Sequence, residues 1–332
     1  MIQNKRSLHR ALSGGTLLFS LTLCHAAIAN DYEVWLSDQA NTQAINNATP
    51  NGTHGGKIRI YDSLDLELET PNNNPLVLDA STDLFPNALT DTGAHVTRIH
   101  GILPSHDHRY MGLNFVASGH VGIVDGESKQ AVCLFRTTAT TTGRQNHMSF
   151  WTNDGSKLIV ANQNGRMLER IDISRNHGEV SAFNFNAAAS LDLVGGDNRI
   201  LAQPIAVDMN PDDNISCAVT GTVADNQSTL TPAGVAKQAA DIRPKNAVIC
   251  PIPASNNQHV YVTLGGGGLF VVDNSTSPMS IVGEYDKSII SSAGCGGVEA
   301  AGFMHINSGT SGPNVSEFSL YRLAQDFPVN FS

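Results

Sequence analysis

Seven residues of metal-binding types stand just before or beside runs that are rich in valine, isoleucine and glycine. The seven are His100, His106, His108, His147, Cys250, Cys295 and Glu299. Imidazole groups bind copper, zinc, iron or nickel, and thiolates select the softer of these ions. The residue types therefore predict a transition-metal site, for copper, zinc or iron, wherever the fold brings them together.

Each of these residues also has a purely structural interpretation. Cys250 and Cys295 could form a disulfide, and the four cysteines beyond the first thirty residues allow three pairings. A histidine could simply hydrogen-bond the backbone of a neighbouring strand. His106 and His108 flank Asp107, and a His-x-His pair in a strand would present both rings on one side for chelation. The sequence leaves these alternatives open.

The elements that would position these residues come from a repeated pattern. Each repeat has an apolar run, a turn of Gly, Asn or Asp, and a second apolar run that ends in a hydrophobic residue and Asp. The copies are 55–62, 113–125, 157–172 and 259–273, of which the last three are the long ones and are called the clear copies below; 217–225 is a weaker copy and 318–321 is the last. Gly and Asn tolerate the positive φ angles of tight turns, so the pattern predicts β-hairpins.

The spacing of the repeats predicts how the hairpins are assembled. They end at positions 62, 125, 172, 225, 273 and 321, so successive ends are 63, 47, 53, 48 and 48 residues apart. A period near fifty residues is typical of propeller blades, each of which is a small four-stranded sheet. We therefore predict an all-β chain folded as a six- or seven-bladed β-propeller, with a β-sandwich as the alternative.

The candidate metal ligands lie in the segments that precede the hairpins. His100, His147 and Cys250 each precede one of the three clear copies. Cys295 and Glu299 precede the next run. In a propeller the innermost strands of successive blades begin at the same end of the central channel, so equivalent positions converge on one axis. We expect these five side chains to line one mouth of the channel.

Other segments carry structural expectations of their own. The Asn- and Pro-rich stretch 63–92 either hides strands, such as Leu76-Val77-Leu78, or is a long insertion. Residues 226–245 resemble an exposed insertion, and the run Gly265–Gly268 predicts a turn. A strand at Asp31–Leu36 would close the ring by pairing with the last blade; otherwise the chain would be a truncated member of a longer family.

The start of the chain has the pattern of an export signal. Residues 1–29 have a basic beginning, a short apolar run at 16–23 and the small-x-small sequence Ala27-Ile28-Ala29. This pattern predicts a cleaved signal peptide at 1–29 and a single propeller domain at 30–332, with an uncleaved anchor as the alternative. We therefore expect a periplasmic or secreted protein, in a compartment where disulfides form.

The charge balance argues against some partners. Without residues 1–29 the chain has 17 basic and 30 acidic residues, a net charge of −13. An acidic surface without a basic stripe repels phosphate, so nucleic acid is excluded as a partner and cationic ligands are favoured. No second apolar stretch reaches the ~20 residues of a membrane span.

Two of the repeats resemble a known family. Lys-Leu-Ile-Val-Ala-Asn with the following Gly and Ile-Asp, at 157–172, and His-Val-Tyr-Val-Thr-Leu-Gly-Gly-Gly-Gly-Leu-Phe-Val-Val-Asp, at 259–273, are similar to the YVTN-type β-propeller repeat. The resemblance covers most of the chain after residue 29, weakly at 174–245. It implies a propeller in a superfamily that includes lactonase-like enzymes, surface-layer proteins, electron-transfer partners and binding proteins. It leaves the activity open, because fold does not imply function.

Two functions fit the sequence. The first is an exported binding or scaffold propeller that holds a small molecule, a partner protein or a metal at the channel mouth. The alternative is a metal-dependent oxidoreductase or a lactonase-like hydrolase with the metal on the propeller axis. No complete catalytic set is evident, and the sequence contains no Gly-x-Ser-x-Gly elbow. Whether the chain is an enzyme stays undecided at this point.

Overall fold

The structure is a computed structural model of the 332-residue chain. It describes residues 32–39, 55–68, 74–195, 197–225, 248–291, 294–309 and 318–324. Within these residues 53% lie in strands and 7% in helices, so the all-β prediction is confirmed. The predicted signal peptide and the insertion expected at 226–245 lie outside the described residues.

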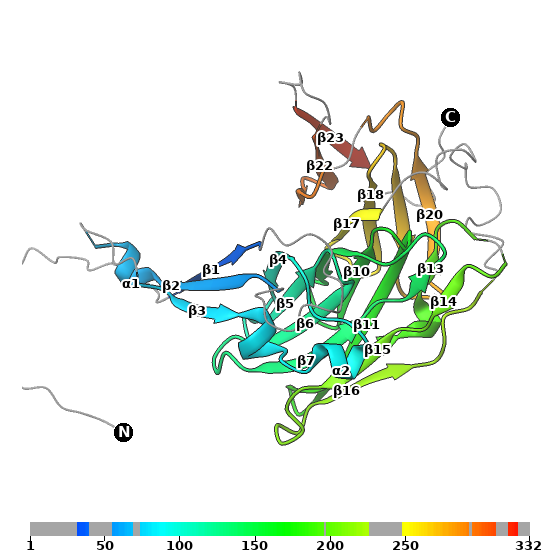
Figure 1. The fold of residues 1–332 in the computed structure, drawn as a ribbon. Coiled ribbons are helices and arrows are strands. Elements are labelled where there is room, and N and C mark those ends of the chain that lie inside the picture. Colours follow the sequence, from blue (N-terminus) through cyan, green and yellow to red (C-terminus); the bar gives the residue numbers. More distant parts are fainter. Residues whose placement is uncertain are drawn as a thin grey trace, which may run out of the picture.

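Three antiparallel sheets, each containing four consecutive strands, form the centre of the fold (Figure 1). The first contains β4 (Ile99–Pro104), β5 (Tyr110–Phe115), β6 (His120–Asp125) and β7 (Ala131–Arg136). The second contains β9 (Asn146–Trp151), β10 (Lys157–Asn162), β11 (Met167–Asn176) and β12 (Glu179–Asn186). The third contains β17 (Val248–Pro253), β18 (His259–Leu264), β19 (Leu269–Asp273) and β20 (Ser280–Tyr285). The three clear repeats are thus the central hairpins β5–β6, β10–β11 and β18–β19.

Five shorter strands extend these sheets or pair beside them. They are β8 (Ala139–Thr140), β13 (Leu191–Asp192), β14 (Ile200–Ala202), β15 (Ile205–Asp208) and β16 (Ser216–Thr220). β13 pairs with β11, β8 with β14, β15 with β7, and β16 runs parallel to β12. The prediction of a separate hairpin at 217–225 is therefore wrong: its first run is an added strand of the second sheet, and the residues after Thr220 form no strand in the described chain.

Two three-stranded sheets lie at the ends of the series. One contains β1 (Glu33–Asp38), β2 (Lys57–Asp62) and β3 (Leu76–Asp79), and the other β21 (Gly297–Ala300), β22 (Phe303–Gly309) and β23 (Phe318–Ala324). The strand expected to close the ring is β1. In the described chain it pairs with β2 and not with a C-terminal strand. The strand suspected at Leu76–Leu78 is present as β3.

Helices are few and short. They are α1 (Ser63–Leu66), the π-helical turn η1 (Ala80–Leu84), α2 (Ala88–Thr92) and the 3₁₀ turn η2 (Ala187–Ala189). Among the described residues, no helix has the length and apolar character needed to cross a membrane.

The turn residues of the repeats account for the hairpins. The carboxylate of Asp125, at the end of β6, accepts a hydrogen bond from the backbone N–H of Ser128 at 2.8 Å. Asp273, at the end of β19, does the same with Ser275 at 2.8 Å. In the predicted glycine turn between β18 and β19, Gly267 has φ +91°, which side chains other than glycine rarely adopt. Aspartate and glycine therefore fix where the strands end and turn.

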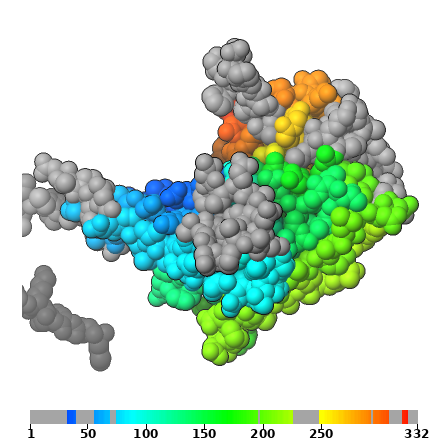
Figure 2. All heavy atoms as spheres, in the orientation of Figure 1, coloured from blue at the N-terminus to red at the C-terminus, as the bar shows by residue number. Residues whose placement is uncertain are grey.

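Apolar clusters join each sheet to the next in one order. Ile58 and Ile60 of β2 pack with Leu113 of β5, and further clusters join the β4–β7 sheet to β9–β12, then to β17–β20, then to β21–β23. β9 contacts β4 on one side and β17 on the other. The N-terminal three-stranded sheet projects from one end of this series (Figure 2), and β22 and β23 lie at the other end (Figure 1). The described sheets do not close into a ring, so the blade number stays a prediction.

Candidate functional site

A β-bulge near the start of two inner strands carries the two histidines. In β4, Ile99 pairs with Phe115 and Gly101 with Asn114, which leaves His100 as the extra residue. In β9, Met148 pairs with Ala161 and Asn146 with Asn162, which leaves His147 as the extra residue. A bulge turns its extra residue out of the regular alternation and re-aims the side chain. The same irregularity therefore presents both histidines.

The third inner strand is irregular at the same place. In β17, Val248 pairs with Leu264 and Pro251 with Val262, so Ile249 and Cys250 lie opposite a single residue, Thr263. The backbone N–H of Cys250 donates to the hydroxyl of Thr263 at 3.2 Å instead of to a strand carbonyl. Three successive sheets thus share a local distortion where the candidate residues stand.

The bulges bring His100 and His147 into contact. Their ring centroids lie 4.6 Å apart with the planes at 52°. Gly101 permits this approach, because a Cβ at that position would overlap the sulfur of Met148 on β9. The absence of a side chain at Gly101 therefore leaves room for the Met148 side chain between β4 and β9.

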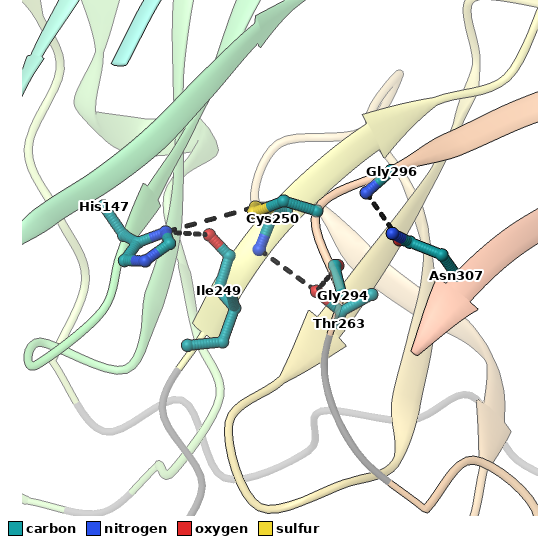
Figure 3. The surroundings of a disulfide bond; sticks show 8 residues. His147, Ile249, Cys250, Thr263, Gly294, Gly296 and Asn307 are labelled. Atoms are coloured by element: carbon teal, nitrogen blue, oxygen red, sulfur yellow. Dashed lines mark hydrogen bonds between the residues drawn. A yellow bond between two sulfur atoms is a disulfide. The ribbon is translucent and has the colours of Figure 1, made fainter. Parts of the chain in front are cut away.

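One nitrogen of His147 is fixed by the backbone (Figure 3). Its Nδ1 lies 3.1 Å from the carbonyl oxygen of Ile249 and 4.0 Å from Sγ of Cys250. A carbonyl only accepts, so Nδ1 carries the proton and Nε2 keeps its lone pair. Metal-binding histidines commonly have this arrangement, in which the second nitrogen donates to a backbone carbonyl and orients the ring.

Both imidazoles are neutral at pH 7. Burial, and then the nearby His100, lower the pKa of His147 to about 4, against the opposing effect of the Ile249 hydrogen bond. Burial and then the charge of Arg98 lower the pKa of His100. Desolvation disfavours the charged form of each ring. The rings therefore act as lone-pair donors at neutral pH.

The two cysteines of the site are bonded to each other. Cys250 and Cys295 form a disulfide with their Cα atoms 5.2 Å apart, and a second disulfide joins Cys133 to Cys217. Of the alternatives that the sequence left open, the disulfide is therefore the one formed. We refer to His100, His147, Cys250 and Cys295 as the His–Cys cluster.

The segment that carries Cys295 is packed without room for side chains. The hydroxyl of Thr263 donates to the carbonyl of Gly294 at 2.9 Å, and the N–H of Gly296 donates to Asn307 Oδ1 at 2.7 Å (Figure 3). A Cβ at Gly294 would overlap the carbonyl oxygen of Asn307. These contacts hold Cys295 beside Cys250.

Glu299 lies away from the cluster. It is on β21, four residues beyond Cys295, and its carboxylate accepts from the backbone N–H of Ser255, past the far end of β17. At about 3.3 Å of rise per strand residue, four residues carry it about 13 Å along the sheet. The structure does not bring Glu299 to the histidines.

His106 and His108 lie in the turn between β4 and β5, not in a strand. His106 Nε2 donates to Asn153 Oδ1 at 3.2 Å. His108 has φ +60° and lines a separate cleft of about 400 Å³ with Trp35 and Asp62. Within the described residues, the only group of three or more metal-binding side chains is His147, Cys250 and Cys295, whose ligand atoms lie within 4.8 Å of one another.

The polar interior that supports the bulges was not among the sequence-based predictions. Asn146 Nδ2 donates to Asn114 Oδ1 at 3.0 Å and to the carbonyl of His120 at 2.8 Å, and Ser149 Oγ donates to the same Asn114 oxygen at 2.7 Å. These residues are fully buried and lock β5 to β9. The only available signal is the presence of asparagine inside otherwise apolar strands.

Nearby, a buried carboxyl makes no ion pair within 4 Å with any described residue. Glu169 on β11 is fully buried, and its Oε1 accepts from the N–H of Thr138 at 3.0 Å. Burial raises the pKa of Glu169 to about 7, although Thr138, Asn162 and Arg144 favour the charged form. This group belongs to the interior behind the cluster.

Comparison with known proteins gives neighbours of fold only. No family model and no curated protein matches the chain. Similar solved structures include the Cps50 (Swd1) β-propeller domain of Myceliophteria thermophila, with TM-score 0.38 and 10% identity over 82% of this chain and 78% of that one. Hsv2 of Kluyveromyces lactis has TM-score 0.34 and 8% identity over 70% and 57%.

A third neighbour is the periplasmic gluconolactonase PpgL of Pseudomonas aeruginosa, with TM-score 0.31 and 11% identity over 63% of this chain and 46% of that one. All three neighbours are β-propeller proteins. The chain spans just over half of Hsv2 and less than half of PpgL. Because every TM-score is below 0.5, no property of the site is taken from them.

Proposed function

We propose that this chain is an exported β-propeller that binds a ligand at the His–Cys cluster, and that the ligand is a transition-metal ion, copper or zinc. The observation that carries the proposal is the state of His147. Its Nδ1–H is committed to the carbonyl of Ile249, its ring stands against His100, and its pKa is lowered to about 4. A neutral, oriented imidazole pair is the donor set that these ions prefer.

The donor set favours binding over catalysis. Two imidazoles leave coordination positions for water, a small molecule or a donor from a partner protein. A catalytic zinc centre normally has three protein ligands. Within the described residues the only three-membered group includes two sulfurs that are already bonded to each other. The oxidoreductase or lactonase-like alternative therefore has less support.

The remaining parts of the proposal rest on the sequence. Export is supported by the pattern at residues 1–29 and by two disulfides, which form in oxidising compartments. The propeller is supported by three meander sheets of four strands that pack side by side with related bulges. Six blades would correspond to the six repeat ends counted in the sequence, and the YVTN resemblance belongs to the same proposal.

The test is metal titration of the oxidised chain from residue 30 onward. Isothermal calorimetry with Cu²⁺ and with Zn²⁺ would measure stoichiometry and Kd for the wild type and for the variants His100→Ala and His147→Ala. We expect one ion per chain, and a Kd raised roughly 10- to 100-fold in either variant. His106→Ala is the matched control and should bind as the wild type does. Unchanged affinity in His147→Ala would overturn the proposal.

A further inference from the structure

We infer that reduction of the Cys250–Cys295 disulfide creates a second binding state of the same cluster, a three-ligand site for a soft metal ion built from His147, Cys250 and Cys295. The inference deepens the proposed function, because it concerns the same cluster, but it does not require that the oxidised chain binds metal. Zinc and monovalent copper are the ions that a two-thiolate, one-imidazole set selects.

The geometry needed for this site already exists. The ligand atoms of the three residues lie within 4.8 Å of one another in the disulfide form. Bonds of about 2.3 Å to sulfur and 2.0 Å to nitrogen place the ligand atoms of a tetrahedral site about 3.5 Å apart. The two sulfurs must therefore separate once their bond is broken, while the imidazole is already within reach.

The surroundings of the disulfide favour attack on one of its two sulfurs over the other. Cys250 is fully buried and Cys295 is half-buried, so we expect a reductant to attack the sulfur of Cys295, the more accessible residue. The thiolate that leaves is then Cys250, 4.0 Å from the Nδ1–H of His147. A donor beside the leaving sulfur stabilises the thiolate and speeds the exchange.

The reduction balances with a dithiol reductant. One of its thiolates attacks Sγ of Cys295, the Cys250–Cys295 bond breaks, and a mixed disulfide forms. The second thiolate of the reductant closes its own disulfide and releases Cys295. Two electrons pass to the protein, and the two protons of the dithiol end on Cys250 and Cys295. A divalent ion then displaces these two protons as it binds the thiolates.

The imidazole of His147 needs only a shift of its proton within the ring to become the third ligand. If Nδ1 is the ligand, its proton moves to Nε2 and the hydrogen bond to the carbonyl of Ile249 is exchanged for the metal bond. The fourth position is left to water.

The other disulfide provides an internal control. Cys217 Sγ lies 3.4 Å from the carbonyl of Val132, and no group of three metal-binding side chains includes Cys133 or Cys217 among the described residues. Reduction of that pair frees two thiols without an imidazole. The difference between the two pairs is therefore the presence of His147.

The experiment uses Co²⁺ as a probe, because thiolate bound to Co²⁺ gives a near-ultraviolet charge-transfer band. The chain from residue 30 onward is reduced, freed of reductant without oxygen and titrated, with far-ultraviolet circular dichroism as the check of folding. We expect the band to saturate at one Co²⁺ per chain in the wild type and in Cys133→Ser/Cys217→Ser. It should be absent in Cys250→Ser/Cys295→Ser, and the Kd should rise roughly 10- to 100-fold in His147→Ala.

The outcomes separate this inference from the proposed function. An equal band in Cys250→Ser/Cys295→Ser, no band in the reduced wild type, or loss of the strand signal on reduction would each overturn the inference. A band in the reduced chain together with no metal binding by the oxidised chain would support the inference and overturn the proposed function. Binding by the oxidised chain alone would do the reverse.

Discussion

The two disulfides of this chain make the same covalent bond in different surroundings. Cys133–Cys217 joins β7 to β16, the strand that extends the neighbouring sheet, and Cys133 is fully buried in an apolar cluster. Cys250–Cys295 joins β17 to the segment before β21 and lies 4.0 Å from an imidazole. The first disulfide therefore fastens two sheets together, and the second has an imidazole beside it that could bind a metal ion together with its sulfurs.

The origin of that difference is the bulge in β9. One extra residue between Asn146 and Met148 turns His147 toward β17, where the carbonyl of Ile249 fixes its ring. His120 provides the contrast: it lies on β6, beside the β7 strand that carries Cys133, and it is fully buried. Both of its nitrogens are hydrogen-bonded, to Thr92 and Ser118, so no lone pair is left for a ligand. What a histidine can bind depends on which nitrogen the fold leaves unused.

The largest expected effect on stability is removal of the fastening disulfide. The two bonds close loops of 84 and 45 residues in sequence separation. By the chain-entropy relation, Cys133→Ser/Cys217→Ser should lose roughly 4–5 kcal/mol and Cys250→Ser/Cys295→Ser roughly 4 kcal/mol of unfolding free energy. Urea denaturation measures both. Metal affinity of the folded Cys133→Ser/Cys217→Ser protein should be unchanged, and a loss as large as in His147→Ala would break the comparison.

The next effect separates the two kinds of histidine. His120 is fully buried with hydrogen bonds of 2.7 Å to Thr92 Oγ1 and 2.8 Å to Ser118 Oγ. His120→Ala leaves a cavity and two buried hydroxyls without that partner, so we expect a loss of roughly 2–4 kcal/mol. His147→Ala should cost only about 1 kcal/mol, the contribution of one hydrogen bond, while its metal Kd rises roughly 10- to 100-fold. Equal stability losses in the two variants would contradict the division between interior and site histidines.

A smaller effect tests how firmly Cys295 is held. In Gly294→Ala the new Cβ would overlap the backbone carbonyl of Asn307, so we expect a loss of about 1–3 kcal/mol from overpacking. Gly112→Ala is the matched control, because its Cβ would meet its first neighbour, Trp151, at an ordinary 3.4 Å. That variant should stay within about 0.5 kcal/mol of the wild type. Thermal unfolding of both distinguishes a rigid Cys295 segment from a loose one.

The last effect is in the pH dependence of stability. The pKa of His147 is lowered to about 4, below its value in the unfolded chain, so the unfolded state takes up its proton first as the pH falls. The stability that His147 contributes is therefore present above pH ~6.5 and is lost between pH ~6.5 and pH ~4. Urea midpoints at pH 8 and pH 5 should differ less in His147→Ala than in the wild type. A larger difference in the variant would contradict the assigned direction.

Much of the fold follows from the sequence, because hairpin turns leave local marks. Gly267 stands in the turn between β18 and β19, and Asp273 stands at the end of β19, as their turn preferences predict. The segment at 217–225 misled because a parallel added strand has the same composition as the first strand of a hairpin. The composition of a segment predicts that it is a strand, but it does not predict the long-range pairing that determines which sheet the strand joins.

The candidate site was predictable in part for the same reason. His100, His147 and Cys250 occupy equivalent places before successive hairpins, and the inner strands carry them together. Glu299 has a residue type that binds metals, but it stands inside β21 instead of before it, four residues beyond Cys295. The bulges do not change the alternation of apolar and polar residues, so they cannot be predicted from the sequence. The tautomer of His147 and its hydrogen bond to Ile249 depend on the bulge, and only the structure shows them.

The central claim is that the two bulged histidines bind one metal ion together. Electron paramagnetic resonance of the oxidised chain with one equivalent of Cu²⁺ tests it directly, because each coordinated imidazole contributes nitrogen hyperfine structure. The account predicts coupling to two imidazoles in the wild type and in His106→Ala, and to one or none in His100→Ala and His147→Ala. A spectrum without imidazole coupling, or one that is unchanged in His147→Ala, would contradict it.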